Sequence, residues 1–214
     1  RGGVGAKASA ARDEDFIEYV HQANMHSTMM FFTEQGRLYW TKVYELPEGN
    51  RQSKGRALQN MINIQKGDKV CAFIHVKNLN DLEYVQNHYL IFATKDGLMK
   101  KTTLESYSRP RANGIIALGL REGDRLIRVT LTDGNSQMLV ASYNGKVVRF
   151  PEDSVRPMGR TATGVRAIKL DEDGQDRVIG MICVEEDSKE SVLVISEKGF
   201  GKRTDLDDEN GEPI

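Results

Sequence analysis

YLIFATKDGLMKKT, from Tyr89 to Thr102, is the stretch that decides the fold of this chain. An apolar run is followed by a polar pair, a glycine and a second, alternating run that ends in basic residues. A tight hairpin turn needs a residue that tolerates positive φ, and Asp96-Gly97 supplies one between two β-rich runs. The stretch therefore predicts a β-hairpin.

The same pattern occurs along the whole chain, as MMFFTEQGRLYWTK (Met29 to Lys42), MLVASYNGKVVRF (Met138 to Phe150) and VLVISEKGFGKRT (Val192 to Thr204). The hairpin glycines stand at positions 36, 97, 145 and 199. Their spacing of about 50 to 60 residues is close to the period of one four-stranded propeller blade. The chain is therefore built from repeats.

A second pattern follows each complete hairpin: a basic or small segment with a glycine, an apolar strand, a turn of Gly-Asp type and another apolar strand. It begins at Arg51 (RQSKGRALQNMINIQKGDKVCAFIHV), Arg109 (RPRANGIIALGLREGDRLIRVTL) and Gly159 (GRTATGVRAIKLDEDGQDRVIGMICV). We predict an all-β fold, a β-propeller or β-pinwheel of four-stranded blades, with units at 25–77, 85–132 and 136–184 and an incomplete one at 190–214. The only helical candidate, Arg12 to Asn24, suits a blade-edge strand as well.

Composition sets limits on function. The 214 residues carry 30 Lys plus Arg against 31 Asp plus Glu, so the net charge of -1 gives no evidence for a polyanionic partner. Cys71 and Cys183 lie in apolar runs and are expected to be reduced core residues. The apolar runs are too short to cross a bilayer, and no signal-peptide pattern opens the chain. We expect a cytoplasmic protein with no membrane partner, and a chain that is a piece of a longer one.

The basic residues recur at fixed places in the repeat, either after the hairpin glycine or in the next loop, while the acidic residues collect elsewhere. In a radially stacked array, equivalent positions fall on one rim, so these residues predict a basic belt that contacts the phosphates of a bent DNA duplex. Small donors in the same loops suit contacts to phosphates without base reading. Tyr39 and Trp40 lie in an alternating strand and are expected to pack between blades rather than to stack on bases.

Further residues carry a family resemblance: RGGVGAK at the start, RDEDFI, FFTEQGRLYWTKVYELPEGNRQSKGRALQNMI, KVVRFPEDSVRPMGRTATGVRAIKL and GFGKRT. In this order and spacing, residues 1–214 resemble part of the C-terminal domain of the DNA gyrase A protein. The resemblance implies a six-bladed β-pinwheel that wraps DNA on a basic perimeter, with about four blades in this chain.

The family's hallmark is a box of sequence Gln-Arg-Arg-Gly-Gly-Lys-Gly. Arg1, Gly2, Gly3 and Gly5 match its later positions, Val4 stands in place of the lysine, and Lys7 offers a nearby cation. Together with the recurring basic residues, these make up the predicted DNA-binding set: Arg1, Gly2, Gly3, Gly5, Lys7, Lys42, Arg51, Lys54, Arg56, Lys100, Lys101, Arg109, Arg111, Lys146, Arg149, Arg160, Arg166, Lys202 and Arg203.

The resemblance implies a non-catalytic domain that supports ATP-dependent negative supercoiling. Its partners would be double-stranded DNA, the gyrase B protein and the rest of the gyrase A protein in an A2B2 holoenzyme, associated with the nucleoid. ATP and Mg²⁺ would be used elsewhere in the holoenzyme, because this sequence has no phosphate-binding loop and its four histidines have no metal-ligand spacing. Two alternatives stay open: the C-terminal DNA-binding domain of the topoisomerase IV A protein, and a protein-binding propeller, although the Gly-His and Trp-Asp signatures of WD repeats are missing.

Overall fold

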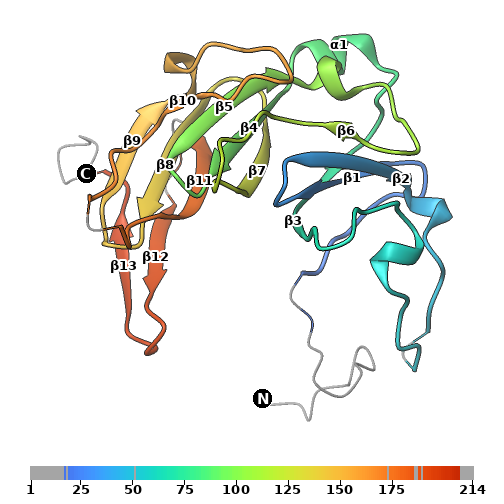
Figure 1. The fold of residues 1–214 in the computed structure, drawn as a ribbon, viewed down its shortest axis with the longest axis horizontal. Helices are drawn as coiled ribbons and strands as arrows, with labels where there is room; N and C mark the ends of the chain where they lie inside the picture. Colours follow the sequence, from blue (N-terminus) through green and yellow to red (C-terminus); the bar gives the residue numbers. More distant parts are fainter. Residues whose placement is uncertain are drawn as a thin grey trace.

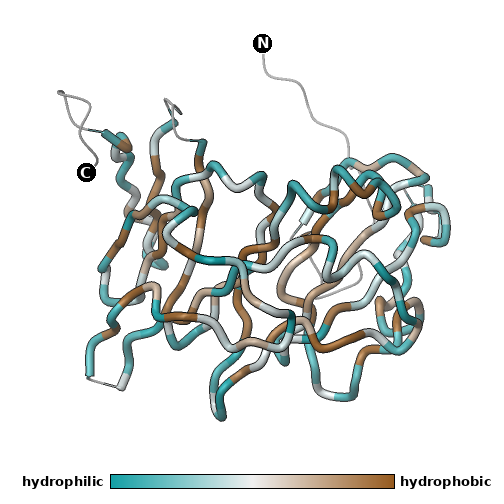
Figure 2. The backbone as a smooth tube through the Cα atoms, turned by 90° about the horizontal axis from the view of Figure 1, so that it is seen from above, coloured by the Kyte–Doolittle hydropathy of each residue, from teal (hydrophilic) through white to brown (hydrophobic). Residues whose placement is uncertain are grey.

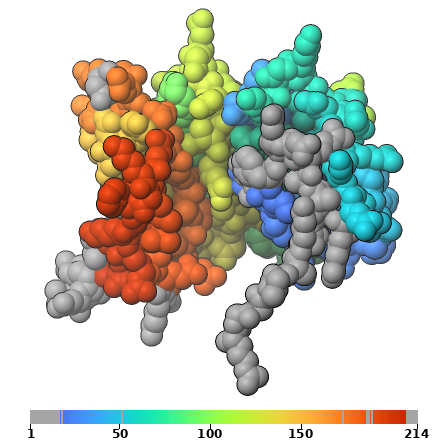
Figure 3. Space-filling model, turned by 90° about the horizontal axis from the view of Figure 1, so that it is seen from below, coloured from blue at the N-terminus to red at the C-terminus, as the bar shows by residue number. Residues whose placement is uncertain are grey.

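The computed structural model describes residues 17, 19–50, 52–172, 174–185, 188 and 190–207. Four antiparallel sheets follow one another along an arc, from the N-terminal sheet to the C-terminal hairpin (Figure 1). Seen into the concave side, the first unit (blue to teal) and the last (red) stand apart, with the other units between them (Figure 3). The predicted all-β fold of propeller blades is confirmed.

The first sheet has the strand order β3-β1-β2-β6. The first repeat supplies β1 (Thr28–Thr33), β2 (Arg37–Lys42) and β3 (Val70–Val76). The fourth strand, β6 (Ile115–Ile116), belongs to the second repeat and pairs with Arg37 and Leu38. The sheet is therefore completed by a strand from the next unit, which the repeat pattern does not predict.

The second sheet repeats this exchange in the order β10-β5-β4-β7. It contains β4 (Tyr89–Thr94), β5 (Leu98–Thr103) and β7 (Leu126–Thr132), and it receives β10 (Val165–Arg166) from the third repeat. The third sheet, in the order β11-β8-β9, contains β8 (Ser136–Ser142), β9 (Val147–Pro151) and β11 (Val178–Glu185). The last consists of β12 (Ser191–Ile195) and β13 (Gly201–Asp205).

The hairpin turns form as the sequence predicts. Gly36, Gly97, Gly145 and Gly199 all have φ between 76° and 86°. The aspartate of the turn before each inner strand then accepts a hydrogen bond from the backbone N–H of the residue before the hairpin glycine. The three pairs are Asp68 with Gln35 at 3.2 Å, Asp124 with Asp96 at 3.0 Å and Asp176 with Asn144 at 3.0 Å. These aspartates fasten the two turns of each unit together.

Three of the four apolar clusters lie between successive sheets, and the fourth, around Phe31 and Ile62, covers the other face of the first sheet. Met30 and Phe32 of the first sheet pack with Leu90 and Phe92 of the second. A second cluster joins the second and third sheets, and a smaller one joins the third sheet to the last hairpin. Brown apolar positions accordingly follow the strands and teal ones the loops (Figure 2). Each sheet therefore depends on its neighbour for burial.

Each exchanged strand begins beside a glycine that touches the neighbouring backbone. Gly114, at φ +66°, lies so close to β2 that a Cβ atom would stand 2.7 Å from the carbonyl oxygen of Leu38 and from the ring of Tyr39. Gly164 is packed in the same way against Met99 at the start of β10. A side chain at either position would push the exchanged strand away from the hairpin.

Helical structure is limited to short connections. The only α-helix in the described part of the chain is α1 (Leu82–Gln86), where the side chain of Asp81 accepts a hydrogen bond from Tyr84 N–H. Short 3₁₀ turns are η1 (Val43–Glu45), η2 (Leu58–Asn60), η3 (Leu104–Tyr107) and η4 (Glu152–Ser154).

The candidate segment from Arg12 to Asn24 is neither helix nor strand at its described residues, 17 and 19–24. The rings of Tyr19 and His21 instead pack on Phe73 of β3, with centroid distances of 5.3 and 5.6 Å. The prediction of a helix or strand there is wrong for these residues, because tertiary ring contacts rather than backbone pairing hold them.

We predict that Gly114→Ala destabilises the fold more than Gly123→Ala. Both glycines have left-handed φ, but a Cβ at Gly123 meets nothing within 4 Å. The control should lose about 1 to 2 kcal/mol from backbone strain alone. Gly114→Ala should lose about 1 to 3 kcal/mol more, from the forced contact with β2. Urea unfolding measures both losses, and equal losses would contradict the close approach described for β6.

Candidate nucleic-acid interface

The predicted DNA-binding residues fall into separate structural environments. Arg1, Gly2, Gly3, Gly5, Lys7 and Arg51 lie outside the described residues. Lys42 and Arg160 are half-buried, and the Lys42 ammonium donates to the carbonyl oxygen of His26 at 3.4 Å. The exposed residues whose side chains make no ion pair or hydrogen bond with another described residue are Lys54, Arg56, Arg109, Arg111, Arg166, Lys202 and Arg203.

Lys100 is buried, so its prediction as a phosphate contact is wrong. Its side chain is 0% exposed, and its ammonium donates to Tyr107 Oη at 3.1 Å, Ala117 O at 2.6 Å and Arg160 O at 2.5 Å. The ammonium also lies 4.7 Å from the centroid of the Phe92 ring. Lys100 therefore joins the second sheet to the segment after β6 and to the loop before β10.

Lys101 is also buried, and its prediction as a phosphate contact is wrong for a related reason. Its ammonium forms an ion pair of 2.8 Å with Glu152 Oε1, and the two side chains are 5% and 0% exposed. The Glu152 carboxylate also accepts from Thr132 Oγ1 at 2.7 Å and from Ser136 N–H at 3.3 Å. The pair joins the second sheet to the third.

Arg149 forms an ion pair at the position of the repeat that matches Lys101, and its side chain is largely buried. The prediction that it is a free cation on the rim is therefore wrong. Its guanidinium donates to Leu206 O at 2.6 Å and to Asp207 Oδ1 at 2.7 Å, and only 12% of its side chain is exposed. Trp40 Nε1 likewise donates to Tyr107 O at 3.1 Å. Trp40, Lys101 and Arg149 each stand four residues after a hairpin glycine, and each donates into the next unit. This position of the repeat carries contacts between sheets.

Lys146 is exposed, but its ammonium is paired with the Asp171 carboxylate. The hydrogen bond from Lys146, assisted by one from Asn144, lowers the pKa of Asp171. Of the basic residues that follow a hairpin glycine, Lys202 and Arg203 thus remain exposed without such a partner among the described residues.

The loops that lead to the exchanged strands carry further cations of the predicted DNA-binding set. Arg109 and Arg111 precede β6, and Arg160 and Arg166 lie before and within β10. These strands are the outer members of their sheets, whereas β3, β7 and β11 contact one another on the inner side. The view in Figure 1 places α1 and the neighbouring loops on the convex side of the arc. The corresponding segment of the first repeat carries Lys54 and Arg56, and no exchanged strand follows it among the described residues.

Arg109, Arg111 and Arg160 converge on one cleft of about 580 Å³ between the first two units, which we call the arginine cleft. Asn80, Glu105, Ser106 and Ser108 also line it, together with the apolar residues Leu79, Leu82 and Ile115. Sequence reasoning did not single out these polar residues, because isolated Asn and Ser residues in loops carry no recognisable pattern.

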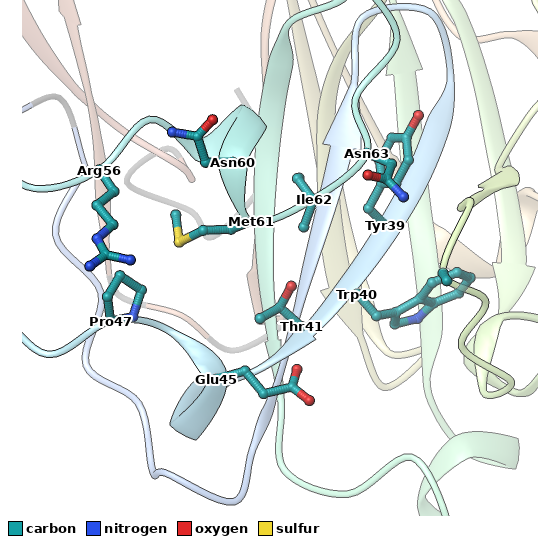
Figure 4. Close-up of a pocket in the computed structure, with 11 residues that line it drawn as sticks. Tyr39, Trp40, Thr41, Glu45, Pro47, Arg56, Asn60, Met61, Ile62 and Asn63 are labelled. Carbon is teal, nitrogen blue, oxygen red and sulfur yellow. The ribbon is translucent and has the colours of Figure 1, made fainter.

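A second pocket, of about 480 Å³, lies beside β2 in the first unit. Arg56 and Asn60 line one side, from the segment that crosses the sheet, and Tyr39 and Trp40 come from β2 (Figure 4). Tyr39 is only 1% exposed, and the Trp40 ring donates a hydrogen bond to Tyr107 O of the second unit. Their predicted role in packing rather than base stacking agrees with this environment.

No cluster of His, Cys, Asp and Glu among the described residues has the arrangement of a metal site. Cys71 and Cys183 are free thiols, and burial raises the pKa of each to about 12, so both stay protonated at neutral pH. No helix in the described part of the chain has the length and apolar character to cross a membrane.

Comparison with known families decides the relationship. A family model described as "DNA gyrase C-terminal domain, beta-propeller" matches residues 27–77, 88–133, 137–185 and 190–208. The chain belongs to this family.

It is 44% identical over 208 residues to the DNA gyrase A protein of Salmonella typhimurium (strain LT2), a match that covers 97% of this chain and 23% of the relative. It is 40% identical over 208 residues to the corresponding gyrase A protein of Staphylococcus aureus (strain COL), over 97% of this chain and 23% of that relative. The chain thus spans about a quarter of the length of these relatives.

Solved structures share the fold of this gyrase C-terminal domain. The C-terminal domain of DNA topoisomerase IV is similar at TM-score 0.75 and 27% identity, over 85% of this chain and 54% of that one. A DNA gyrase A C-terminal domain is similar at TM-score 0.68 and 22% identity, over 86% and 56% respectively. The resemblance stated from the sequence is confirmed.

We predict that Lys100 makes the stability of this gyrase C-terminal domain depend on pH. Burial, together with the nearby Arg160 guanidinium, lowers the pKa of Lys100 from 10.5 to about 7. Between these two values the unfolded chain holds more protons than the folded one. The free energy of unfolding should therefore rise with pH through this window, by up to about 1.4 kcal/mol per pH unit.

The control is Lys100→Met, which keeps the length of the side chain and removes its titration. Urea unfolding at pH 7, 8 and 9 should show a stability that rises less with pH in the variant than in the unmodified chain. Parallel pH profiles would show that Lys100 does not titrate in this range.

Proposed function

We propose that this domain binds duplex DNA along its convex edge, through the loops that lead to the exchanged strands. The observation that carries the proposal is the set of exposed cations in these loops that have no protein partner among the described residues. Arginine and lysine in such positions neutralise phosphates and release condensed counterions. Thr161 and Thr163 add small donors that suit phosphate contacts without base reading.

The local charge distribution supports this proposal, although the net charge is only -1. Several carboxylates are occupied within the fold: Asp68 and Asp124 accept backbone N–H groups, and Glu152 pairs with Lys101. The arginines of the outer loops have no such partners among the described residues. A duplex that follows the curved edge must bend, at a cost on the order of 1 to 6 kcal/mol for 40 to 90°, which several phosphate contacts can offset.

The relatives are DNA gyrase A proteins, and we infer that this domain serves negative supercoiling in an A2B2 holoenzyme with the gyrase B protein. The domain would bend the duplex near the cleavage core, while ATP and Mg²⁺ would act in other parts of the assembly. It would work in the cytoplasm, on nucleoid DNA. The similarity to gyrase A proteins at 44% identity favours this role over that of a topoisomerase IV domain or a protein-binding propeller.

We predict that replacing Lys54, Arg56 and Arg166 with alanine weakens duplex binding and flattens its salt dependence. If each side chain neutralises one phosphate, the slope of log affinity against log salt should fall in magnitude by about 2.7. Fluorescence anisotropy with a labelled linear duplex at several salt concentrations measures both quantities.

The matched control replaces Lys66, Lys69 and Lys77, which are also exposed but lie outside these loops. It removes the same charge and should change the slope little. Equal effects of the two triple variants would contradict binding along the convex edge and would leave only a general effect of charge.

A second prediction concerns Arg1 to Lys7, the segment that resembles the family's box. In the reconstituted holoenzyme, deletion of this segment should abolish negative supercoiling and preserve relaxation, because the segment is proposed to hold the wrap rather than to cleave DNA. Val4→Lys, which restores the lysine of the box, should retain supercoiling. Plasmid topology on agarose gels provides the measurement, and supercoiling that survives the deletion would favour a role like that of topoisomerase IV.

A further inference from the structure

We propose that the arginine cleft binds a single backbone phosphate of the duplex, held jointly by Arg109, Arg111 and Arg160. This inference rests on the DNA binding proposed above and makes it specific: one phosphate is gripped where the first two sheets meet, and the other loops make separate contacts.

The cleft is assembled from the second repeat, the third repeat and the connection that precedes the second. Asn80 comes from the segment before α1, Arg109 and Arg111 come from the loop between η3 and β6, and Arg160 comes from the loop before β10. Because β6 belongs to the first sheet, the strand exchange itself brings these arginines to the junction. The cleft exists only when adjacent units are stacked.

The electrostatics of the cleft favour an anion. None of its three guanidinium groups has an ion pair or hydrogen bond with another described residue, so their repulsion is not offset inside the protein. Glu105 is the one acidic residue among the residues that line the cleft, and its carboxylate accepts from Gln86 Nε2 at 3.4 Å. Three arginines without ion-pair partners among the described residues line one concave site, and arginine binds phosphate in bidentate fashion.

The position of Arg160 is fixed by its backbone. Arg160 O accepts from the buried ammonium of Lys100, which also donates to Ala117 O just after β6. Gly119 N–H donates to Ala162 O at 3.2 Å, and a Cβ at Gly119 would stand 2.6 Å from Thr161 O. The loop that carries Arg160 thus rests on the segment after β6, and the cleft is formed before any ligand arrives.

A joint site for one phosphate predicts a different salt dependence from three independent contacts. Replacement of Arg109, Arg111 and Arg160 with glutamine removes three positive charges, but it removes only one phosphate contact, because the three arginines share it. The salt slope should then fall in magnitude by about 0.9, against about 2.7 for the triple variant at Lys54, Arg56 and Arg166. Each single glutamine variant of the cleft should weaken binding by about tenfold, and the combined loss should be smaller than the product of the three.

A second comparison moves the loop without changing any charge. Gly119→Ala should displace Thr161 and Arg160 and weaken duplex binding several-fold, whereas Gly159→Ala, where a Cβ meets nothing within 4 Å, should leave binding unchanged. Circular dichroism and urea unfolding establish that both variants fold. Glu105→Gln, which removes the one carboxylate that lines the cleft, should tighten binding.

The outcomes separate the two proposals. If the unmodified chain shows no salt-dependent duplex binding, both proposals fail. If it binds, but the triple variant of the arginine cleft loses about as much salt slope as the triple variant at Lys54, Arg56 and Arg166, or keeps its affinity, the single-phosphate site is overturned and edge binding stands. A small loss of slope with a large loss of affinity, reproduced in part by Gly119→Ala, supports the site.

Discussion

Burial of one sheet face against the next is the constraint on which this structure depends. A sheet of three or four short strands cannot remove its apolar faces from water alone. The cluster that contains Phe32 and Phe92 and the cluster that contains Met138 both lie between units. The polar contacts follow the same rule. Trp40, Lys101 and Arg149 extend from equivalent positions into the next unit, so each apolar interface also carries a directed hydrogen bond or ion pair.

The same residue types perform two tasks in this chain, and position in the repeat separates them. Basic residues three or four positions after a hairpin glycine lie on the faces of a sheet, and where a neighbouring sheet covers them, as at Lys100 and Lys101, they become part of the interior. Arg109 and Arg111, in the loop toward an outer strand, keep their charge in solvent. A basic belt inferred from recurrence alone therefore includes residues that hold the sheets together.

Much of the fold could be predicted from the sequence, because glycine turns between β-rich runs mark the hairpins. The exchange of β6 and β10 could not, since two-residue strands have no periodicity and their partners lie about 80 and 70 residues away along the chain. The burial of Lys100 could not be predicted from the sequence either. Its backbone acceptors are Ala117, farther along the same repeat, and Arg160 in the next one, and a sequence does not state which face of a strand a neighbour will cover. To predict the arginine cleft, one would need to know both the strand exchange and the contacts of buried Lys100.

The strand exchange also has a mechanical consequence. The chain that forms β6 in the first sheet continues directly into β7 of the second, so adjacent units share a covalent crossing as well as an apolar interface. A force that separates two sheets would have to pull β6 away from β2 and remove Gly114 from its contact with Leu38 at the same time. Opening of the arc therefore requires the loss of strand pairing as well as the exposure of apolar surface.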